Sequence, residues 1–515
     1  MSRYILKTLG CKANLYDTQL IEQELQKRGW MPHSSTSETS GTPGLVEDSP
    51  GTQLCIVNSC TVTNEADRQS RKMATRLARD NPQAIVVMTG CGAEVDPESM
   101  AQVKGVHYVV GNQNKDRIID LILEKTQTKQ DFDPSLTSDI LKQETLGTTK
   151  TYKELTSTHP LDREWPAPDS FTFPTSKQEK GQSSTTRSFL KIQDGCNSFC
   201  TYCIIPYGRG PTRSLKPEPL IHQIKRLVEQ GAKEVILTGI NIGDYGKDWG
   251  KDKEPALDTL IDRILSETSV ERLRVSSLDP TEITPKMIQM MEKDSRFCPH
   301  FHVSLQSPHS RILRLMKRPY RFEQVQECLL RLSELSSPSA PIGGAFVGMD
   351  VITGFPGETQ EEFEWTYEAL ESLPWTRLHV FPYSERAGTP ATKLPNSVPH
   401  SKRVDRARKL NHLSFERLKK KYTSVLEECK ATGKTLDSIL VEGAGNQSLK
   451  SGYTPNYLKV MIPVETNSEN SFYNKTISAS PIDLTLDTAG WDVAFIGTRL
   501  SFAYPLTQNQ NQPKK

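Results

Sequence analysis

The sequence predicts an α/β protein with three folded parts: an N-terminal parallel-sheet domain over residues 1–125, a central (β/α)6-type partial barrel over residues 187–430 and a small all-β barrel over residues 431–505. Two observations support this prediction. Short apolar runs alternate with amphipathic segments in the first two parts, which is typical of βα units and a parallel sheet. After Gly433 the pattern changes to short alternating strands. A chain of 515 residues is long enough for three domains.

The N-terminal part contains four apolar runs, each followed by a segment with helical periodicity. The expected strands are 4–9, 54–58, 84–88 and 108–111, and the expected helical segments are 16–28, 64–80, 97–103 and 114–125. Residues 33–53 are rich in Ser, Thr, Gly and Pro and are predicted to form a surface loop. Residues 126–186 turn polar and are predicted to be a linker or insert that is at most partly ordered.

The central and C-terminal parts are delimited by the same patterns. The expected barrel strands are 190–192, 235–238, 273–276, 301–305, 347–353 and 378–381, closed by a basic amphipathic helix near 398–428. The small module should contain strands at 438–442, 458–463, 476–482 and 492–496, with turns at Gly443, Gly452 and Asn456. The Gln/Asn-rich tail, 506–515, is predicted to be disordered.

The sequence also indicates the cellular compartment of the protein. The start, MSRYILKTLG, lacks the apolar core of a signal peptide, and no run of about 18 apolar residues could span a bilayer. Ten cysteines in so long a chain are too sparse for a disulfide scaffold, so clustered thiols are better interpreted as metal ligands. A cytoplasmic protein with no membrane partner is expected.

Positive charge is concentrated in three stretches although the net charge is only +2. Residues 402–421 contain nine Lys or Arg against Asp405 and Glu416, for a net charge of +7. Residues 68–79 and 311–321 contain five basic residues each and no acidic ones. Each stretch alone could be a solvated helix face, but three in one chain favour a nucleic-acid partner.

One short segment contains Cys196, Cys200 and Cys203, separated by three and then two residues. Iron–sulfur cubanes held for electron transfer are normally capped by four thiolates, so three predict a cubane with one open iron. The usual ligand of such an iron is S-adenosylmethionine, which accepts an electron to generate a carbon radical. The alternatives are half of a four-cysteine zinc site, whose spacing does not fit, or a chance cluster.

A second set of cysteines is dispersed: Cys11, Cys60 and Cys91 each follow an expected strand. Loops after parallel strands converge on one crevice, so these thiols can meet in space. Gly10 and Gly90 directly precede two of them and permit turns that aim the side chains. The alternative is three unrelated buried cysteines. The remaining cysteines are interpreted as structural: Cys55, Cys298, Cys328 and Cys429.

Four motifs together resemble the methylthiotransferase family of radical S-adenosylmethionine enzymes: TLGCKAN at 8–14, VNSCTVTNEADRQSR at 57–71, TGCGAE at 89–94 and KIQDGCNSFCTYCIIPYGRG at 191–210. The resemblance covers nearly the whole chain except the 33–53 and 126–186 segments and the tail. It implies a radical SAM core and a C-terminal TRAM-like RNA-binding barrel. It also implies two [4Fe-4S] clusters, an auxiliary one on Cys11, Cys60 and Cys91 and a radical one on Cys196, Cys200 and Cys203.

Loops at the strand ends of the barrel supply candidate contacts to S-adenosylmethionine. These are Thr238, Gly239, Asn241, Ser276, Ser277, Gln306, Gly354, Gly357 and Glu358. The first three end one expected strand, where the amino group would bind, and the two serines end the next, within reach of a ribose. Residues 353–358 resemble the family's adenine-side loop. Around Gln306 the chain departs from its relatives, which usually have Pro and Gly in place of Ser304 and Pro308.

The start Cys11-Lys12-Ala13-Asn14, the segment 237–246 and HVFPYSERAGTP at 379–390 are similar to the branch that acts on threonylcarbamoyladenosine in tRNA. The isopentenyladenosine branch usually begins its first motif with Cys-Gln and the ribosomal-protein branch with Cys-Pro. The expected function is therefore insertion of a methylthio group at C2 of N6-threonylcarbamoyladenosine beside the anticodon. Alternatives are a methylthiotransferase of isopentenyladenosine tRNA or of a ribosomal protein, and a non-catalytic, metal-stabilised RNA-binding protein.

The resemblance implies a division of labour between the clusters. Reduction at the cluster of Cys196, Cys200 and Cys203 would cleave S-adenosylmethionine, and the cluster of Cys11, Cys60 and Cys91 would hold the sulfur. A second S-adenosylmethionine would supply the methyl group, so no side chain is expected to act as catalytic acid or base. The partners implied are the tRNA anticodon stem-loop, held through phosphate contacts, and an electron donor such as flavodoxin or ferredoxin.

Overall fold

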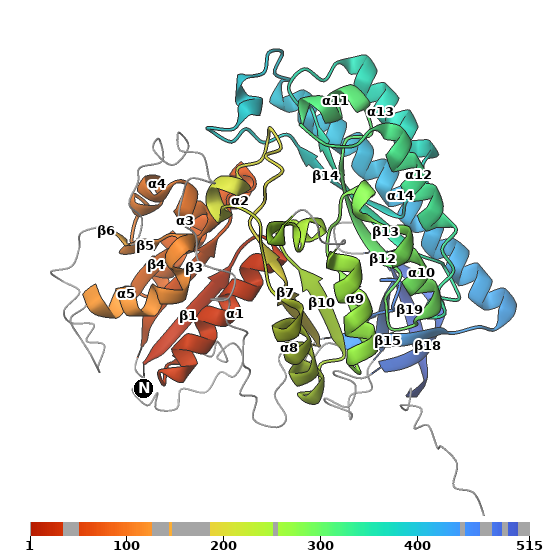
Figure 1. The fold of residues 1–515 in the computed structure, drawn as a ribbon, viewed down its shortest axis with the longest axis horizontal. Helices are drawn as coiled ribbons and strands as arrows, with labels where there is room; N and C mark the ends of the chain where they lie inside the picture. Colours follow the sequence, from red (N-terminus) through yellow and green to blue (C-terminus); the bar gives the residue numbers. More distant parts are fainter. Residues whose placement is uncertain are drawn as a thin grey trace, which may run out of the picture.

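The computed structural model describes residues 2–33, 51–125, 144–146, 186–250, 256–442, 449–463, 476–486 and 493–502. The predicted 33–53 loop, the predicted 126–186 linker and the predicted tail lie almost entirely outside these residues. Figure 1 shows the N-terminal sheet beside the central barrel, with the small C-terminal barrel next to the latter. The α/β fold class predicted from the sequence is confirmed. Among the described helices, none is long and apolar enough to cross a membrane.

The N-terminal domain is a six-stranded parallel sheet in the order β2-β1-β3-β4-β5-β6. Its strands are β1 (Arg3–Thr8), β2 (Met31–Pro32), β3 (Thr52–Ser59), β4 (Ile85–Gly90), β5 (Tyr108–Val110) and β6 (Glu144–Leu146). Its helices are α1 (Lys12–Lys27), α2 (Asn64–Asp80), α3 (Cys91–Val95), α4 (Pro97–Ala101), the 3-10 helix η1 (Asn112–Arg117) and α5 (Ile118–Lys125). Strand β6 lies within the segment predicted as a linker.

Both faces of this sheet are buried, which is why its strands read as continuous apolar runs. Leu54 and Ile56 of β3 pack into the core on one side, and Cys55 and Val57 into the core on the other. Helix α1 begins at Lys12, four residues before the predicted start, because Asn14 of its first turn donates hydrogen bonds to the Leu9 and Ser59 carbonyls and ties that turn to the sheet edge. The strand order turns around between β1 and β3, and ligands of open α/β sheets bind at such a point.

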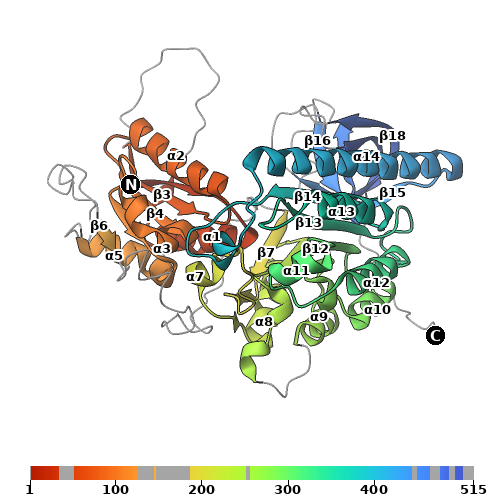
Figure 2. The ribbon, with the colours of Figure 1, turned by 90° about the horizontal axis from the view of Figure 1, so that it is seen from above.

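The central domain consists of two three-stranded parallel sheets, β7-β10-β11 and β12-β13-β14, joined by the isolated bridges Leu273–Phe297 and Leu278–Val303. The six strands are β7 (Arg187–Lys191), β10 (Glu234–Thr238), β11 (Arg272–Val275), β12 (His300–Gln306), β13 (Phe346–Thr353) and β14 (Arg377–Pro382). All six were predicted. They form a partial barrel whose open side faces the N-terminal domain (Figure 2).

Helices cover the outside of this barrel: α8 (Pro217–Glu229), α9 (Ala256–Glu267), α10 (Pro285–Lys293), α11 (Ser310–Leu315), α12 (Phe322–Ser333) and α13 (Gln360–Ser372). Side chains alternate along the strands. In β12, Phe301, Val303 and Leu305 belong to the large core beneath the helices, whereas His300 and His302 face inward. The barrel interior is therefore polar.

Helix α14 (His400–Thr432) packs on β14 and on the C-terminal module. That module is a closed barrel in the order β15-β16-β17-β19-β18, formed by β15 (Leu436–Glu442), β16 (Leu449–Tyr453), β17 (Lys459–Pro463), β18 (Thr476–Leu486) and β19 (Val493–Phe502). The prediction of a turn at Gly452 is wrong, because Gly452 lies inside β16 and pairs with Val441. A Cβ there would stand 2.6 Å from Ile439 Cγ2, so the glycine permits close strand packing.

Candidate functional site

The three dispersed cysteines meet at the carboxyl edge of the N-terminal sheet. Cys11 precedes α1, Cys60 follows β3, and Cys91 is the first residue of α3 directly after β4. Cys11 and Cys60 thus flank the point where the strand order turns around. The three thiols are near enough that negative charge on one raises the pKa of another. The structure brings together the set that the sequence predicted.

Two glycines permit this convergence. Gly10 has a φ of 95°, and a Cβ on it would lie 2.6 Å from Cys60 Sγ. Gly90 has a φ of 92°, and a Cβ on it would lie 2.4 Å from the Ser59 carbonyl oxygen. Any larger residue would be both strained and in collision at these positions. The glycines before two of the cysteines are required by the geometry of the site.

The environment of these thiols suits a strongly bound cationic centre. Burial raises the pKa of Cys60 to about 12, so its thiolate forms at neutral pH only when a metal displaces the proton. Cys91 is buried, and its sulfur accepts hydrogen bonds from Arg209 Nε at 3.3 Å and Asn112 Nδ2 at 3.5 Å. Donors of this kind, which contact a metal ligand and not the metal, orient and tune metal-bound thiolates.

Arg209 connects the two domains through a buried charge network. Its guanidinium donates to Asp17 at 2.8 Å and to Asp194 at 2.9 Å, and it also donates to Asn14. Two lysines complete the network: Lys191 contacts Asp17 at 2.7 Å and Asp194 at 2.9 Å, and Lys115 contacts Asp17 at 2.5 Å. Burial alone would raise the pKa of Asp17, but these three cations outweigh it and hold the pKa well below its usual value.

The contiguous cysteines lie in the loop between β8 (Gln193–Asp194) and α7 (Ile205–Arg209). The Cys203 N–H donates to the Cys200 carbonyl at 2.9 Å, and Cys196 Sγ accepts from the Ser198 N–H at 3.4 Å. Cys200 Sγ also accepts from Arg318 Nη1 at 3.3 Å. Burial raises the pKa of Cys203, and the other two thiols raise it further, so these three sulfurs also face one another.

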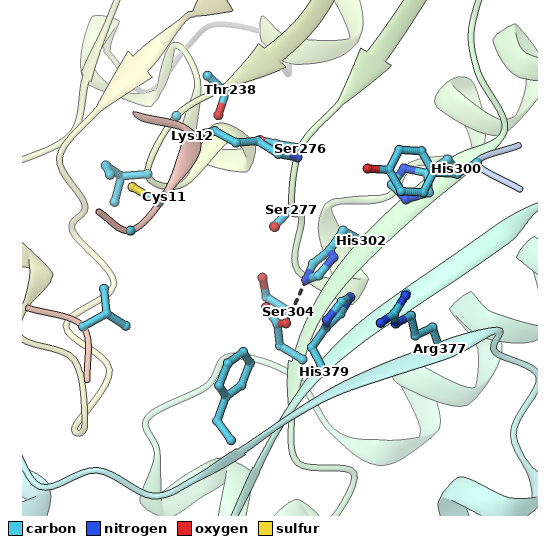
Figure 3. A pocket seen from close by; sticks show the side chains of 18 of the residues that line it. Cys11, Lys12, Thr238, Ser276, Ser277, His300, His302, Ser304, Arg377 and His379 are labelled. Carbon is cyan, nitrogen blue, oxygen red and sulfur yellow. Dashed lines mark ion pairs between the residues drawn. The ribbon is translucent and has the colours of Figure 1, made fainter. Parts of the chain in front are cut away.

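A cleft of about 800 Å³ opens between the three folded parts. Cys11, Cys60 and Cys91 line it together with inward-facing residues of β12, β13 and β14. Figure 3 shows Cys11 across the cleft from His302 of β12 and His379 of β14. Residues 453 and 457, from the C-terminal barrel, close a further wall. The loop of the contiguous cysteines borders this space, because Asn241 Nδ2 donates to Ser198 at 3.4 Å and the next helix supplies Ile205 and Arg209 to the lining.

The predicted S-adenosylmethionine contacts divide into two groups. Thr238, Gly239, Ser276 and Ser277 line the cleft beside the cysteines. Asn241 does not line it, but its backbone N–H is bound to Gln193 Oε1 at 2.9 Å. Gln306 lies at an irregular strand end with a φ of 65°.

The remaining three candidates lie away from the cleft lining and have structural partners. Glu358 is buried and accepts from Arg406 at 2.6 Å and from the Gly354 N–H at 2.7 Å. A Cβ on Gly354 would lie 2.4 Å from Arg403 Cγ, and the Gly357 N–H donates to the Asn396 carbonyl at 2.9 Å. All nine contacts stay predictions.

The inner end of the cleft has an unusual charge balance. Glu234 is buried and pairs with Arg274 at 3.1 Å and Arg272 at 2.8 Å, while Arg187 donates to Glu442 at 2.9 Å. Lys12 lines the cleft next to Cys11, and the charges of Arg274, Arg187 and Glu234 act on its ammonium group. Desolvation inside the cleft lowers its pKa to about 8, and the positive charges of the neighbouring arginines contribute.

The basic stretches are less exposed than the sequence suggested. Arg403 and Arg406 of α14 are buried and pair with Glu385 at 2.7 Å and Glu358 at 2.6 Å. Arg318, in the 311–321 stretch, is turned inward to Cys200. In the 68–79 stretch, four arginines pair with acids: Arg68, Arg71, Arg76 and Arg79. Exposed lysines remain at Lys419 and Lys420, beside the cleft-lining Leu418 and Tyr422.

Comparison with known proteins defines the class. Residues 190–370 match the family model described as Radical SAM superfamily, and residues 3–111 match the model described as Uncharacterized protein family UPF0004. Among solved structures, the fold is similar to the radical S-adenosylmethionine methyltransferase TsrM from Kitasatospora setae, with a TM-score of 0.48, 14% identity and coverage of 87% of this chain and 79% of that chain. The Radical SAM match contains the contiguous cysteine loop, so this central part of the chain is of the radical S-adenosylmethionine class.

Curated relatives show to which family within this class the chain belongs. The chain is 34% identical over 469 residues to threonylcarbamoyladenosine tRNA methylthiotransferase MtaB of Bacillus subtilis, covering 90% of each chain. It is 34% identical over 436 residues to the protein of the same name from Aquifex aeolicus, covering 85% of this chain and 92% of the relative. The chain belongs to the methylthiotransferase family of radical S-adenosylmethionine enzymes.

Several residues that shape the site were not singled out from the sequence: Asn14, Asp17, Asn112, Lys191, Asp194, Arg209, His302, Arg318 and His379. Arg209 lies inside the 191–210 motif, shortly after the cysteine loop, so the motif itself was the available signal. Lys191 and Asp194 lie in the same motif. Asp17 lies outside all four motifs, and its pairing depends on how two domains dock, so it could not have been found.

Proposed function

We propose that this enzyme inserts a methylthio group at C2 of N6-threonylcarbamoyladenosine in tRNA, with S-adenosylmethionine and two [4Fe-4S] clusters. The observation that supports this most directly is the convergence of two separate cysteine trios beside one cleft, in a chain that aligns over 90% of its length with a relative of that name. The proposal includes a cytoplasmic location, the anticodon stem-loop as the bound part of the tRNA, and flavodoxin or ferredoxin as electron donor.

The donor sets fit the two clusters. The first would be held by Cys11, Cys60 and Cys91 and the second by Cys196, Cys200 and Cys203, each trio leaving one iron open. Within the described part of the chain, no three His, Cys, Asp or Glu side chains come together as tightly as a single metal ion requires. A cubane binds each thiolate to a different iron and therefore tolerates wider spacing than one zinc ion does.

The protein's own residues position the reactants. When bound, the clusters and S-adenosylmethionine supply the radical chemistry and the sulfur. Thr238, Gly239, Ser276 and Ser277 offer hydroxyl and backbone groups beside the cysteines and would bind the cofactor there. Arg209 and Arg318 each donate to one cysteine sulfur and would stabilise its thiolate form. The three folded parts supply the walls of the cleft and would shield the reacting carbon of a bound substrate from water.

The experiment that tests this function is mass spectrometry of tRNA nucleosides from a deletion strain. Loss of the methylthio form of threonylcarbamoyladenosine, restored by the wild-type gene and not by Cys200→Ala, is the expected result. Unchanged levels of that nucleoside, with loss of a methylthio group on isopentenyladenosine or on a ribosomal protein, would reassign the chain to a sister branch. A purified protein containing zinc and no iron would instead indicate a non-catalytic RNA-binding role.

A further inference from the structure

Behind the cleft lining, next to Lys12, a buried cluster holds more positive than negative charge. Four cations, Lys12, Arg187, Arg272 and Arg274, surround two acids, Glu234 and Glu442. Arg272 is additionally satisfied by the carbonyl oxygens of Ser438, Tyr453 and Thr454. Because buried charge is costly unless it is paired, this corner is stabilised by any anion that enters it.

Lys12 is the cation of this group that a ligand can reach. Its side chain faces the cleft next to Cys11, and Figure 3 shows it directed toward Ser276. The carboxylate whose charge acts on Lys12 is Glu234, which is already paired with Arg272 and Arg274. Arg274, by contrast, is almost fully buried, lies 4.9 Å over the ring of Tyr457 and contributes its field from beneath.

Polar groups with unused hydrogen-bonding capacity adjoin the same corner. His300 lines the cleft, and its Nδ1 has no hydrogen-bond partner among the described residues. Arg274 Nη1 is likewise unpartnered within that part of the chain. His300 packs against Tyr457 with ring centroids 4.4 Å apart, which fixes the imidazole in place. The corner thus combines positive charge, polar atoms without hydrogen-bond partners among the described residues, and a rigid aromatic wall.

Lys12 directly follows Cys11 and lines the same cleft, so an oxyanion that reaches Lys12 lies close to the thiols of the dispersed trio. Backbone phosphates of an RNA lie at the rim of such a cleft and contact exposed cations there. The modified base itself has one ionised group, the carboxylate of its threonyl moiety. The threonylcarbamoyl group is attached to the base through N6, on the same side of the ring as C2, so its carboxylate can extend toward Lys12 while C2 faces the cysteines.

We propose that the corner formed by Lys12, Arg274 and His300 is a carboxylate site that binds the threonyl carboxylate of the modified adenosine, and that Lys12 is its specificity-determining contact. This inference rests on the proposed function, since it presupposes a threonylcarbamoyladenosine substrate. The proposal explains why a lysine lies beside a thiol in this cleft. Among the described residues that line the cleft, Asp350 is the one acid, and it already contacts His302 at 2.8 Å.

The test compares RNA binding by reconstituted wild-type protein and by Lys12→Gln. Three anticodon stem-loops are used, bearing adenosine, threonylcarbamoyladenosine or the methyl ester of threonylcarbamoyladenosine, and affinity is measured by fluorescence anisotropy. The wild type should bind the acid about 10- to 100-fold more tightly than the ester, as a charge-assisted hydrogen bond predicts. Lys12→Gln should bind both equally. Lys104→Gln, at an exposed lysine outside the cleft lining, should retain the preference.

Other outcomes would overturn the proposal in distinguishable ways. A wild type that binds the adenosine and threonylcarbamoyladenosine stem-loops equally would contradict the proposed function itself. A Lys12→Gln protein that still prefers the acid over the ester would exclude Lys12 from the site. Equal weakening of all three stem-loops would make a phosphate the ligand. Weakened S-adenosylmethionine binding alone would assign the corner to the carboxylate of that cofactor.

A second readout needs no variant and holds even if Lys12→Gln loses iron. Acetylation of lysine amines in the wild type is followed by peptide mass spectrometry in the presence of each stem-loop. The acid should protect Lys12 and the ester should not, while Lys104 is modified equally in all samples. Equal protection of Lys12 by acid and ester would contradict a carboxylate contact.

Discussion

The two cysteine trios reach similar local geometry by opposite routes. Cys196, Cys200 and Cys203 lie in one loop, where local backbone hydrogen bonds such as Cys203 N–H to the Cys200 carbonyl set their spacing. Cys11, Cys60 and Cys91 come from three strand ends, and only the parallel sheet and its glycine turns bring them together. The first trio should therefore tolerate the removal of distant interactions, whereas the second depends on the fold around it.

The largest effect should come from removing one thiol of each trio. Cys200→Ala should abolish reductive cleavage of S-adenosylmethionine, and the product with it, because the contiguous trio is proposed to bind the radical cluster. Cys60→Ala should leave cleavage measurable while eliminating the methylthio product. Both are followed by chromatography of 5′-deoxyadenosine and of tRNA nucleosides. If Cys60→Ala stopped cleavage with the fold and the remaining iron intact, the proposed division of labour would be wrong.

A large effect on stability is expected at Asp17, whose charge acts on Cys11 of the dispersed trio. Asp17→Asn leaves Lys115, Lys191 and Arg209 with Asp194 as the one acid of the network, so the free energy of unfolding should fall by about 3–5 kcal/mol. Urea denaturation measures it. Asp120→Asn is the matched control, because Asp120 pairs with Arg28 near the surface and should contribute less than about 1 kcal/mol. Equal decreases in the free energy of unfolding for the two variants would show that the network does not stabilise the contact between the domains.

The comparison also explains what the sequence could predict. The contiguous trio is visible in spacing alone, and the dispersed trio is visible because each thiol follows an apolar strand. The pairing within the Arg209 network is not visible, since its partners come from α1, η1, β7 and β8 and meet only after docking. The same reason explains why the exposed positive charge of the basic stretches was overestimated. Glu358 and Glu385, which lie outside these stretches in the sequence, neutralise Arg406 and Arg403. Strand β16 was missed because Gly452 is typical of a turn.

A moderate effect is expected at the rim of the cleft, where the trios are not involved. Replacing Lys419, Lys420 and Lys421 by Ala should weaken tRNA binding and flatten its dependence on salt, by roughly one unit of log–log slope for each phosphate that is no longer neutralised. Affinity is measured between low and physiological salt. Replacing the exposed Lys225, Lys286 and Lys293 on the outer helices should change the slope little. An unchanged slope in the first variant would place the RNA elsewhere.

The smallest effect should come from Cys55, which is five residues from Cys60 and fully buried in the core beneath α2. Cys55→Ala should cost about 1 kcal/mol of stability through poorer packing and should cost no iron. Thermal denaturation and iron analysis measure the two quantities. A missing cluster in Cys55→Ala together with a retained one in Cys60→Ala would show that the wrong cysteine had been assigned to the dispersed trio.

The most direct test of two independent cluster sites is the iron content of three proteins reconstituted anaerobically side by side. The wild type should contain about eight iron atoms per chain, as two cubanes require, and each protein with one whole trio replaced by alanine should contain about four. Stoichiometric zinc without iron, or a wild type with only about four iron atoms per chain after full reconstitution, would contradict the account.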